Sequence, residues 1–199
     1  MKRLARGYTV VELMMSLAVF ATGVTGIIAM QRATITTNQV ARNVAVANGI
    51  AQAWLTQLQS DGTLWQPKVV PAITPVWLLT ANASNGLWQL PAWDATRQFG
   101  PQFDGFGAPV QANGQFCAQI RLTWLYGDGT SQGGLNGNGL IRTEVRVFWP
   151  RDTLGTAGFD AGDCTDNTQA TVDGVAAKTT KYHFVVQAGA VRQPMQTAQ

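Results

Sequence analysis

The fold of this chain is decided by its N-terminus, which reads MKRLARG over residues 1–7 and YTVVELMMSLAVFATGVTGIIAM over residues 8–30. A short basic leader precedes a long apolar run, and Glu12 is the only charged residue in that run. About 20 consecutive apolar residues are enough to cross the hydrocarbon core of a bilayer. The run 8–30 is therefore predicted to form a transmembrane helix.

Glu12 is costly in such a run. An ionised acid at the centre of a membrane helix costs roughly 2.5–3.5 kcal/mol on insertion scales, and less near the end of the helix, where Glu12 lies. The chain has only one other glutamate, Glu144, so Glu12 does not come from a glutamate-rich background. The cost indicates that the Glu12 carboxylate gains a positive partner when the segment leaves the lipid and packs against protein.

The charges on either side of the run favour one orientation. The leader carries Lys2, Arg3 and Arg6, whereas the flank beyond the run, as far as Val40, carries only Arg32. Because positively charged flanks stay in the cytoplasm, we expect the leader to stay there and the body to lie on the far side of the membrane.

The junction between the leader and the apolar run, GYTVVE over residues 7–12, resembles the class III prepilin signal of the type IV pilins. In that family a membrane prepilin peptidase cuts after the glycine, the new N-terminal residue is N-methylated, and a glutamate at the fifth mature position serves assembly. The resemblance implies prepilin cleavage between Gly7 and Tyr8, N-methylation of Tyr8 and an assembly function for Glu12. The family usually has Phe at the position of Tyr8.

Two other interpretations of the N-terminus stay open. An ordinary secretory signal peptide would be removed near the weak small-residue site Ala21-Thr22-Gly23. Glu12 lies early in the apolar run, which is unusual for such a signal. The segment could also be an uncleaved anchor in which Glu12 has no function.

A helical period continues beyond the apolar run. Apolar residues recur at intervals of three and four, which is typical of one stripe on a helix. They are Val40, Val44, Ala47, Ala51, Trp54 and Leu58. No proline interrupts residues 8–66, and Gly62 is expected to cap the helix just beyond Ser60. The pattern predicts one continuous helix over about 8–59, with its first half, 8–30, in the membrane or in a filament core.

The rest of the chain predicts a β-rich body. Alternation of apolar and polar residues predicts three strands, near 116–126, 141–149 and 181–187. The glycine-rich link 127–140 makes the first two strands an antiparallel hairpin. Prolines and dense turn signals make 61–114 an irregular connecting region with at most short elements.

The expected fold class is α+β, in the layout that pilins share: the C-terminal half of the long helix packs on an antiparallel sheet. We expect a soluble pilin head over 31–199. Its amphipathic helix covers 31–60, and the sheet and C-terminal loops cover 115–199.

The two cysteines, Cys117 and Cys164, are predicted to form a disulfide. An even number of cysteines outside the cytoplasm is typical of a disulfide, which here would close a loop of about 48 residues, worth roughly 4 kcal/mol in the chain-entropy model. The alternative is two free thiols. Cys117 has the parity of the wetter face of its strand, so the disulfide should pin the loop 151–180 to the outer side of the sheet. In pilins a loop bounded by a disulfide is a usual surface for subunit contacts, although here the last strand lies beyond Cys164.

The charge balance argues against a nucleic-acid ligand. The formal net charge is +3, but the three cations of the leader account for it, because the remaining 11 Lys and Arg match the 11 Asp and Glu. A DNA-binding surface needs clustered Lys and Arg to neutralise phosphates. The closest approaches to a cluster, Arg142 with Arg146 and Lys178 with Lys181, are interpreted as solvated residues of strands and loops.

No residue pattern for catalysis, a metal or a cofactor stands out. No carboxylate pair and no Ser-His-Asp or Cys-His set offers a nucleophile beside a base, and we expect no enzyme activity and no cofactor. Asp160, Asp163 and Asp166 recur every third residue but lack the ordered spacing of a calcium loop, so turn-forming aspartates are favoured. His183, the only histidine, alternates within a strand and is interpreted as structural.

The sequence does not assign a function to the tryptophan-rich region 63–93. Exposed tryptophan clusters can bind sugars, but buried or interfacial tryptophan is much commoner. The residues concerned are Trp65, Trp77, Trp88 and Trp93.

The layout is closest to that of minor pilins of the PilV type. The resemblance implies a structural subunit that helps to prime pilus assembly and enters the filament or its tip complex. It also implies a single-pass protein of the inner membrane of a Gram-negative bacterium, with its head in the periplasm, that later joins a cell-surface pilus. Motility and cell adhesion are the implied processes. The implied partners are other minor pilins, the major pilin, the prepilin peptidase, the inner-membrane assembly platform and a tip adhesin. The alternatives are a type II secretion pseudopilin, an adhesive or DNA-uptake minor pilin, and a periplasmic domain behind a cleaved signal peptide.

Overall fold

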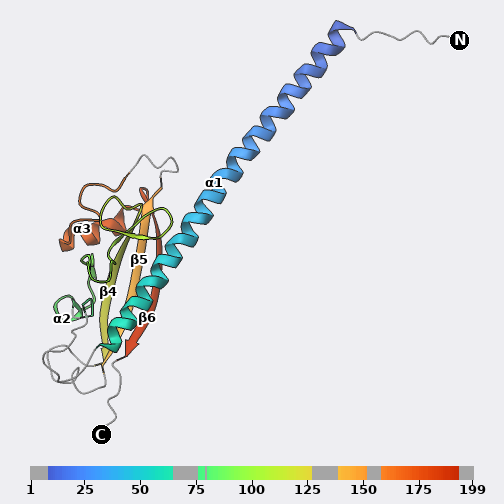
Figure 1. Cartoon of the computed structure of the whole chain (residues 1–199). Helices are drawn as coiled ribbons and strands as arrows, with labels where there is room; N and C mark the ends of the chain where they lie inside the picture. Colours follow the sequence, from blue (N-terminus) through green and yellow to red (C-terminus); the bar gives the residue numbers. More distant parts are fainter. Residues whose placement is uncertain (1–8, 65–75, 79, 127–138, 152–157, 193–199) are drawn as a thin grey trace. The chain divides into compact units, whose positions relative to one another are not determined.

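The structure is a computed structural model that describes residues 9–64, 76–78, 80–126, 139–151 and 158–192. The chain has an α+β architecture, with one long N-terminal helix and a six-stranded antiparallel sheet (Figure 1). It divides into two compact units, an N-terminal one that ends at Arg42 and a C-terminal one that begins at Asn43, called the head below.

Helix α1 runs from Val10 to Thr63, so the predicted long helix is confirmed. Its end lies beyond the predicted one, and the expectation that Gly62 caps it is wrong. Gly62 is a buried helical residue whose missing side chain makes room for Val191 of the sheet, since a Cβ atom there would collide with the Val191 Cγ1 atom. Close approach of strand and helix, and not helix termination, requires this glycine.

The three strands predicted from alternation are all present and antiparallel. They are β4 (Phe116–Tyr126), β5 (Leu140–Pro150) and β6 (Tyr182–Arg192). The predicted end of β6 at residue 187 is wrong, because pairing with β5 continues to Arg192. Ala188, Gly189 and Ala190 are all small, so the sequence shows no alternation of apolar and polar residues there. This part of the strand was therefore not predictable from the pattern.

The connecting region contributes short elements. They are α2 (Thr80–Ala83), β1 (Trp88–Gln89), β2 (Gln102–Phe103) and β3 (Pro109–Val110). The sheet has the order β3-β2-β4-β5-β6, and β1 also pairs with β4. Strands of two residues are too short for a periodic pattern, which is why the sequence predicted only three strands.

The main core lies between α1 and the inner face of the sheet. Trp54 of α1 is fully buried and meets Trp77 and Phe99 edge to face, with ring centroids 5.2 and 4.7 Å apart. Alternate residues of β4 and β5, among them Ile120 and Val145, complete this core. Trp77 is 2% exposed and is therefore a core residue and not a sugar-stacking surface.

A buried carboxylate ties the end of α1 to the connecting region. Asp61 is 1% exposed and accepts hydrogen bonds from the backbone N–H groups of Val76, Trp77 and Leu78 at 2.9, 2.9 and 3.0 Å. Arg97 approaches the same carboxylate at 3.4 Å and lies over the Trp77 ring. These bonds compensate the burial of the Asp61 charge, which would otherwise be costly.

We expect Asp61→Ala to destabilise the head by about 3 kcal/mol, because it leaves three N–H groups without their acceptor and removes one of the two carboxylates that pair with Arg97. Asp61→Asn keeps one acceptor oxygen and should lose less. The measurement is urea unfolding of the full chain in detergent, followed by tryptophan fluorescence. Gln59→Ala, on the exposed side of the same helix, should change the free energy of unfolding by under about 0.5 kcal/mol. Equal losses for Asp61→Ala and Gln59→Ala would contradict this account.

Candidate functional site

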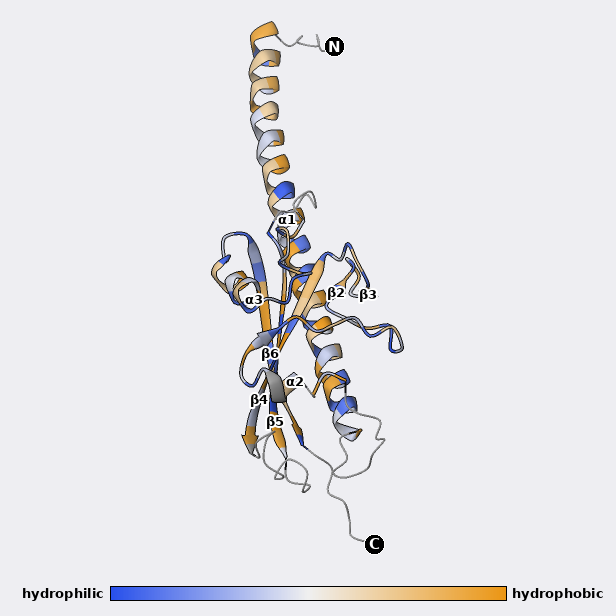
Figure 2. Ribbon diagram, turned by 90° about the vertical axis from the view of Figure 1, so that its left-hand side faces the viewer, coloured by the Kyte–Doolittle hydropathy of each residue, from blue (hydrophilic) through white to orange (hydrophobic). Residues whose placement is uncertain are grey.

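The N-terminal unit offers an apolar helical surface. α1 contains a stretch long and apolar enough to cross a membrane, and none of that stretch is buried. Val10, Met15 and Phe20 are each more than two thirds exposed. Figure 2 shows the apolar colouring of this half of α1. A water-exposed surface of this kind is unfavourable, so the segment needs lipid or protein around it.

The hydroxyl groups of this segment are compatible with such surroundings. Each one donates a hydrogen bond to a backbone carbonyl three or four residues earlier in α1. The donors are Ser16, Thr22, Thr25, Thr34, Thr36 and Thr37. Because the helix satisfies these donors itself, they carry little cost in an apolar environment.

The first turn of α1 contains a feature that the sequence analysis missed. The Glu12 N–H group donates to the Thr9 hydroxyl at 3.3 Å, and the Leu13 N–H group donates to the Thr9 carbonyl at 3.2 Å. Thr9 therefore caps the helix, and Thr9-x-x-Glu12 has the spacing of a capping box. A carboxylate in the first turn also interacts favourably with the helix dipole. The T-x-x-E signal was visible in the sequence.

The Glu12 carboxylate itself has no charged partner within the described part of the chain. Its side chain is exposed, and no ion pair or side-chain hydrogen bond joins it to another described residue. The predicted cleavage site Gly7 and the predicted methylation site Tyr8 lie outside the described residues. The site therefore consists of an apolar helix surface with one acid in its first turn that no described residue pairs with.

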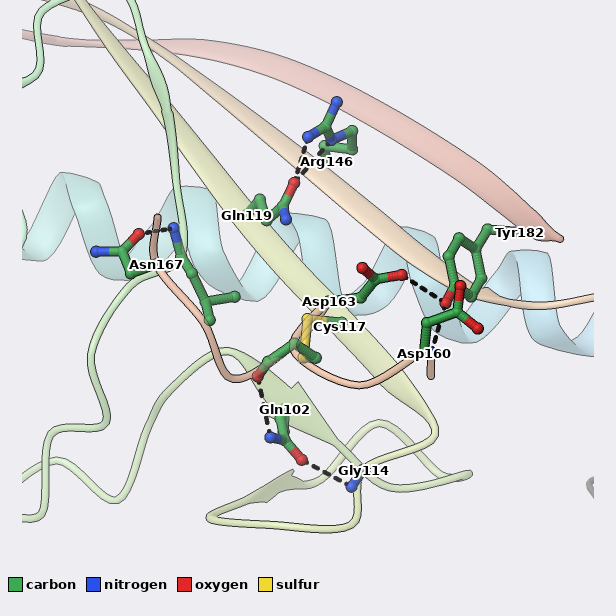
Figure 3. Close-up of a disulfide and its surroundings, with 11 residues drawn as sticks. Gln102, Gly114, Cys117, Gln119, Arg146, Asp160, Asp163, Asn167 and Tyr182 are labelled. Atoms are coloured by element: carbon green, nitrogen blue, oxygen red, sulfur yellow. Dashed lines mark hydrogen bonds between the residues drawn. A yellow bond between two sulfur atoms is a disulfide. The ribbon is translucent and has the colours of Figure 1, made fainter. Parts of the chain in front are cut away.

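The predicted disulfide is present. Cys117 of β4 is bonded to Cys164, with Cα atoms 5.9 Å apart (Figure 3). The bond fixes the segment around Cys164 to the outer face of the sheet, as predicted. The prediction that Cys117 lies on a wetter face is wrong, because Cys117 is 0% exposed.

The outer face carries a second hydrophobic core. It is covered by α3 (Gln169–Gly174), the short helix η2 (Val175–Ala177) and the segment around Cys164. This core consists of Leu90, Cys117, Phe148, Cys164, Val172, Val175 and Tyr182. The residues of β4 and β5 that point to this outer face, many of them polar, are therefore buried as well.

Arg146 of β5 is one of the polar residues buried by this cover. Its interpretation as a solvated residue is therefore wrong. It is 5% exposed, lies over the Trp88 ring at 4.5 Å, and donates to the Gln119 side chain and to the Val172 carbonyl. Burial lowers the pKa of the Arg146 guanidinium to about 10, and Asp173 opposes this effect. Arg121 lies over the same Trp88 ring at 4.7 Å, so two guanidinium groups contact this one tryptophan.

The aspartates after residue 159 form contacts within the chain. Asp163 accepts hydrogen bonds from Lys178 and from the Tyr182 hydroxyl, each at 2.7 Å, and Asp160 pairs with Lys178 and Lys181. Asp166 accepts bonds from its own turn, which lowers its pKa. Among the described residues no group of three or more His, Cys, Asp or Glu could hold a metal ion.

His183 lies in β6 and stacks on Trp149 of β5, with ring centroids 5.4 Å apart. Burial lowers its pKa, and the nearby positive charge of Arg151 lowers it further.

The Tyr182–Asp163–Lys178 contacts predict a stability change at high pH. Burial, with a smaller effect of the Asp163 carboxylate, raises the pKa of Tyr182 from 10.0 to about 12, and Asp163 raises the pKa of Lys178. A raised pKa in the folded state means that the stabilisation is complete below the unfolded value and is lost as the pH rises. The free energy of unfolding should therefore fall between about pH 10 and pH 12, with a smaller fall in Tyr182→Phe. Urea unfolding over this range measures it, and equal slopes for both proteins would contradict it.

Comparisons of the chain with protein-family models, with curated proteins and with solved structures found no match. The residues and the geometry described above are therefore the whole basis for a functional proposal.

Proposed function

We propose that the chain is a minor subunit of a type IV pilus, made as a prepilin and held in the inner membrane before assembly. The observation that carries the proposal is a single helix, α1, that joins an exposed apolar segment with one acid in its first turn to the core of an α+β head. A pilus subunit needs both parts, because one must be soluble in lipid and then pack in a filament, while the other folds in the periplasm.

In this proposal Glu12 sets the position of the subunit in the filament. Cleavage after Gly7 creates a positively charged amine at Tyr8, and the Glu12 carboxylate of one subunit pairs with that amine on a neighbour. Two unit charges 4 Å apart attract each other by about 4 kcal/mol at an effective dielectric constant of 20. This attraction is larger than the roughly 2.5–3.5 kcal/mol that an acid costs in a membrane helix. Pairing in the filament therefore favours the transfer of Glu12 out of the lipid.

The proposed partners follow from this assembly path. A prepilin peptidase processes the chain, the inner-membrane platform extracts it, and the major pilin and other minor pilins receive it in the filament or its priming complex. A tip adhesin is a further proposed partner. The same N-terminus fits a type II secretion pseudopilin, and co-purification with major pilin or with secretion pseudopilins separates the two systems.

The Glu12 side chain can contribute through its charge or through its residue type at the capping-box position, and three variants separate the two. Glu12→Gln keeps the capping-box residue type but loses the charge, whereas Glu12→Ala and Glu12→Leu lose both. If the charge acts in assembly, all three variants should insert into the membrane normally but fall at least about tenfold in sheared pili, the equivalent of about 1.4 kcal/mol. Immunoblots of membranes and of sheared pili measure both quantities. Normal incorporation of Glu12→Gln alone would assign Glu12 to helix capping instead.

The experiment that tests the whole proposal is mass spectrometry of the mature N-terminus from the native host. We expect a chain that starts at Tyr8 and carries one methyl group. A start near Val24 would mean an ordinary signal peptide. Glu12 would then be removed with the leader and the proposed function would fail.

A further inference from the structure

The two edges of the sheet differ in how they are protected. At one edge lies β3, which has two residues and begins with Pro109. At the other lies β6, which has 11 residues, contains no proline and pairs with β5 without a register shift (Figure 1). Natural proteins usually blunt long edge strands with proline, bulges or charges, because such edges pair with other chains. In the described sheet β3 is blunted and β6 is not.

The hydrogen-bond pattern shows which groups of β6 point outward. Arg151 donates its N–H group to the Lys181 carbonyl, so these two residues are a hydrogen-bonded pair of the antiparallel ladder. Hydrogen-bonded and non-bonded pairs alternate along such a ladder. The odd-numbered residues of β6 therefore bond to β5, and the even-numbered residues direct their N–H and C=O groups away from it. The outward N–H group of Tyr182 confirms this pattern, because it donates to the Lys178 carbonyl.

The remaining outward groups have no partner in the described structure. They belong to Phe184, Val186, Ala188, Ala190 and Arg192, and no described residue accepts their N–H groups. The side chains of Ala188 and Ala190 are small and exposed, and Val186 is 55% exposed. A chain that approaches this edge would therefore meet a flat row of main-chain donors and acceptors.

The charges around β6 indicate which kind of strand could pair with its open edge. Residues 182–192 contain no acid, and a cation lies at each end of the strand. Arg192 is the last residue of the strand, and the Arg151 side chain donates to the Tyr182 carbonyl at the other end. Lys181, at the same end as Arg151, is already paired with Asp160. Residues 184–191 are uncharged. A second copy of this chain, paired antiparallel through its own β6, would bring Arg192 of one copy toward Arg151 of the other, and neither β6 contains an acid.

We propose that the outer edge of β6 (the β6 edge, residues 184–192) binds an extended strand of a partner protein that carries acidic residues at its ends. Main-chain hydrogen bonds to the five outward residues provide the pairing, and carboxylates at the ends face Arg192 and Arg151. The proposal concerns the head alone and does not depend on the filament proposal.

Proline substitution tests the β6 edge because it removes one outward N–H group and leaves the ladder to β5 intact. Ala188→Pro is the test variant, Ala190→Pro is an independent second one, and Ala188→Thr is the matched control that changes the side chain but keeps the N–H group. Thermal unfolding of each full-length protein in detergent establishes that it is folded. If one proline variant has lost its unfolding transition, the other decides the result.

The probe is a displayed library of random twelve-residue peptides, selected on the wild-type chain with counter-selection on Ala188→Pro. We expect enrichment of alternating β-forming sequences with Asp or Glu at their ends. The enriched peptide, synthesised with a fluorophore, should bind the wild type and Ala188→Thr equally and both proline variants about tenfold more weakly, as expected for loss of a main-chain bond. Its binding should slow hydrogen exchange in 184–192.

Four results would overturn the proposal. They are a library without an enriched peptide, an enriched peptide without acids at its ends, equal binding to the proline variants, and protection from exchange outside β6. Sedimentation of the wild type without peptide gives a further check. A dimer that disappears in Ala188→Pro would show that a second copy occupies the β6 edge, and the acidic partner strand would be wrong.

Discussion

Coverage of the sheet on both faces is the constraint on which the rest of the head depends. One face of β4 and β5 packs against α1, and the opposite face packs against α3 and the segment held by the disulfide. A sheet covered on both sides has no strand face left for water over the covered part. Polar residues of these strands must therefore find partners inside the protein, and Arg146 with Gln119 is the clearest case.

The elements with a strong period were predictable from the sequence. The intervals from Val40 to Leu58 predicted the amphipathic half of α1, and alternation predicted β4, β5 and most of β6. The Cys117–Cys164 bond was predictable because the chain has only two cysteines. In each case the prediction rested on residues close together in the chain or on the number of residues of one type.

The errors come from contacts between residues far apart in the chain. Burial of Cys117 and Arg146 depends on a cover formed by residues after 158, which have no period of their own. Glycine commonly ends helices, so the sequence predicts Gly62 as a cap. Its contact with Val191 instead depends on a strand more than a hundred residues later. At the N-terminus the Thr9-x-x-Glu12 spacing is a local signal that the sequence does contain, and it accounts for the start of α1.

Burial of the disulfide sets an order on the maturation of the head. Cys117 and Cys164 are 0% and 3% exposed, so an oxidising enzyme has no access to the sulfur atoms in the finished fold. The bond must form while the outer core is still open, before α3 and η2 cover it. A chain whose cysteines stay reduced would lack the tether that holds this cover in place. Oxidation of the two cysteines is thus a step in the folding of the head and not a later modification of the finished fold.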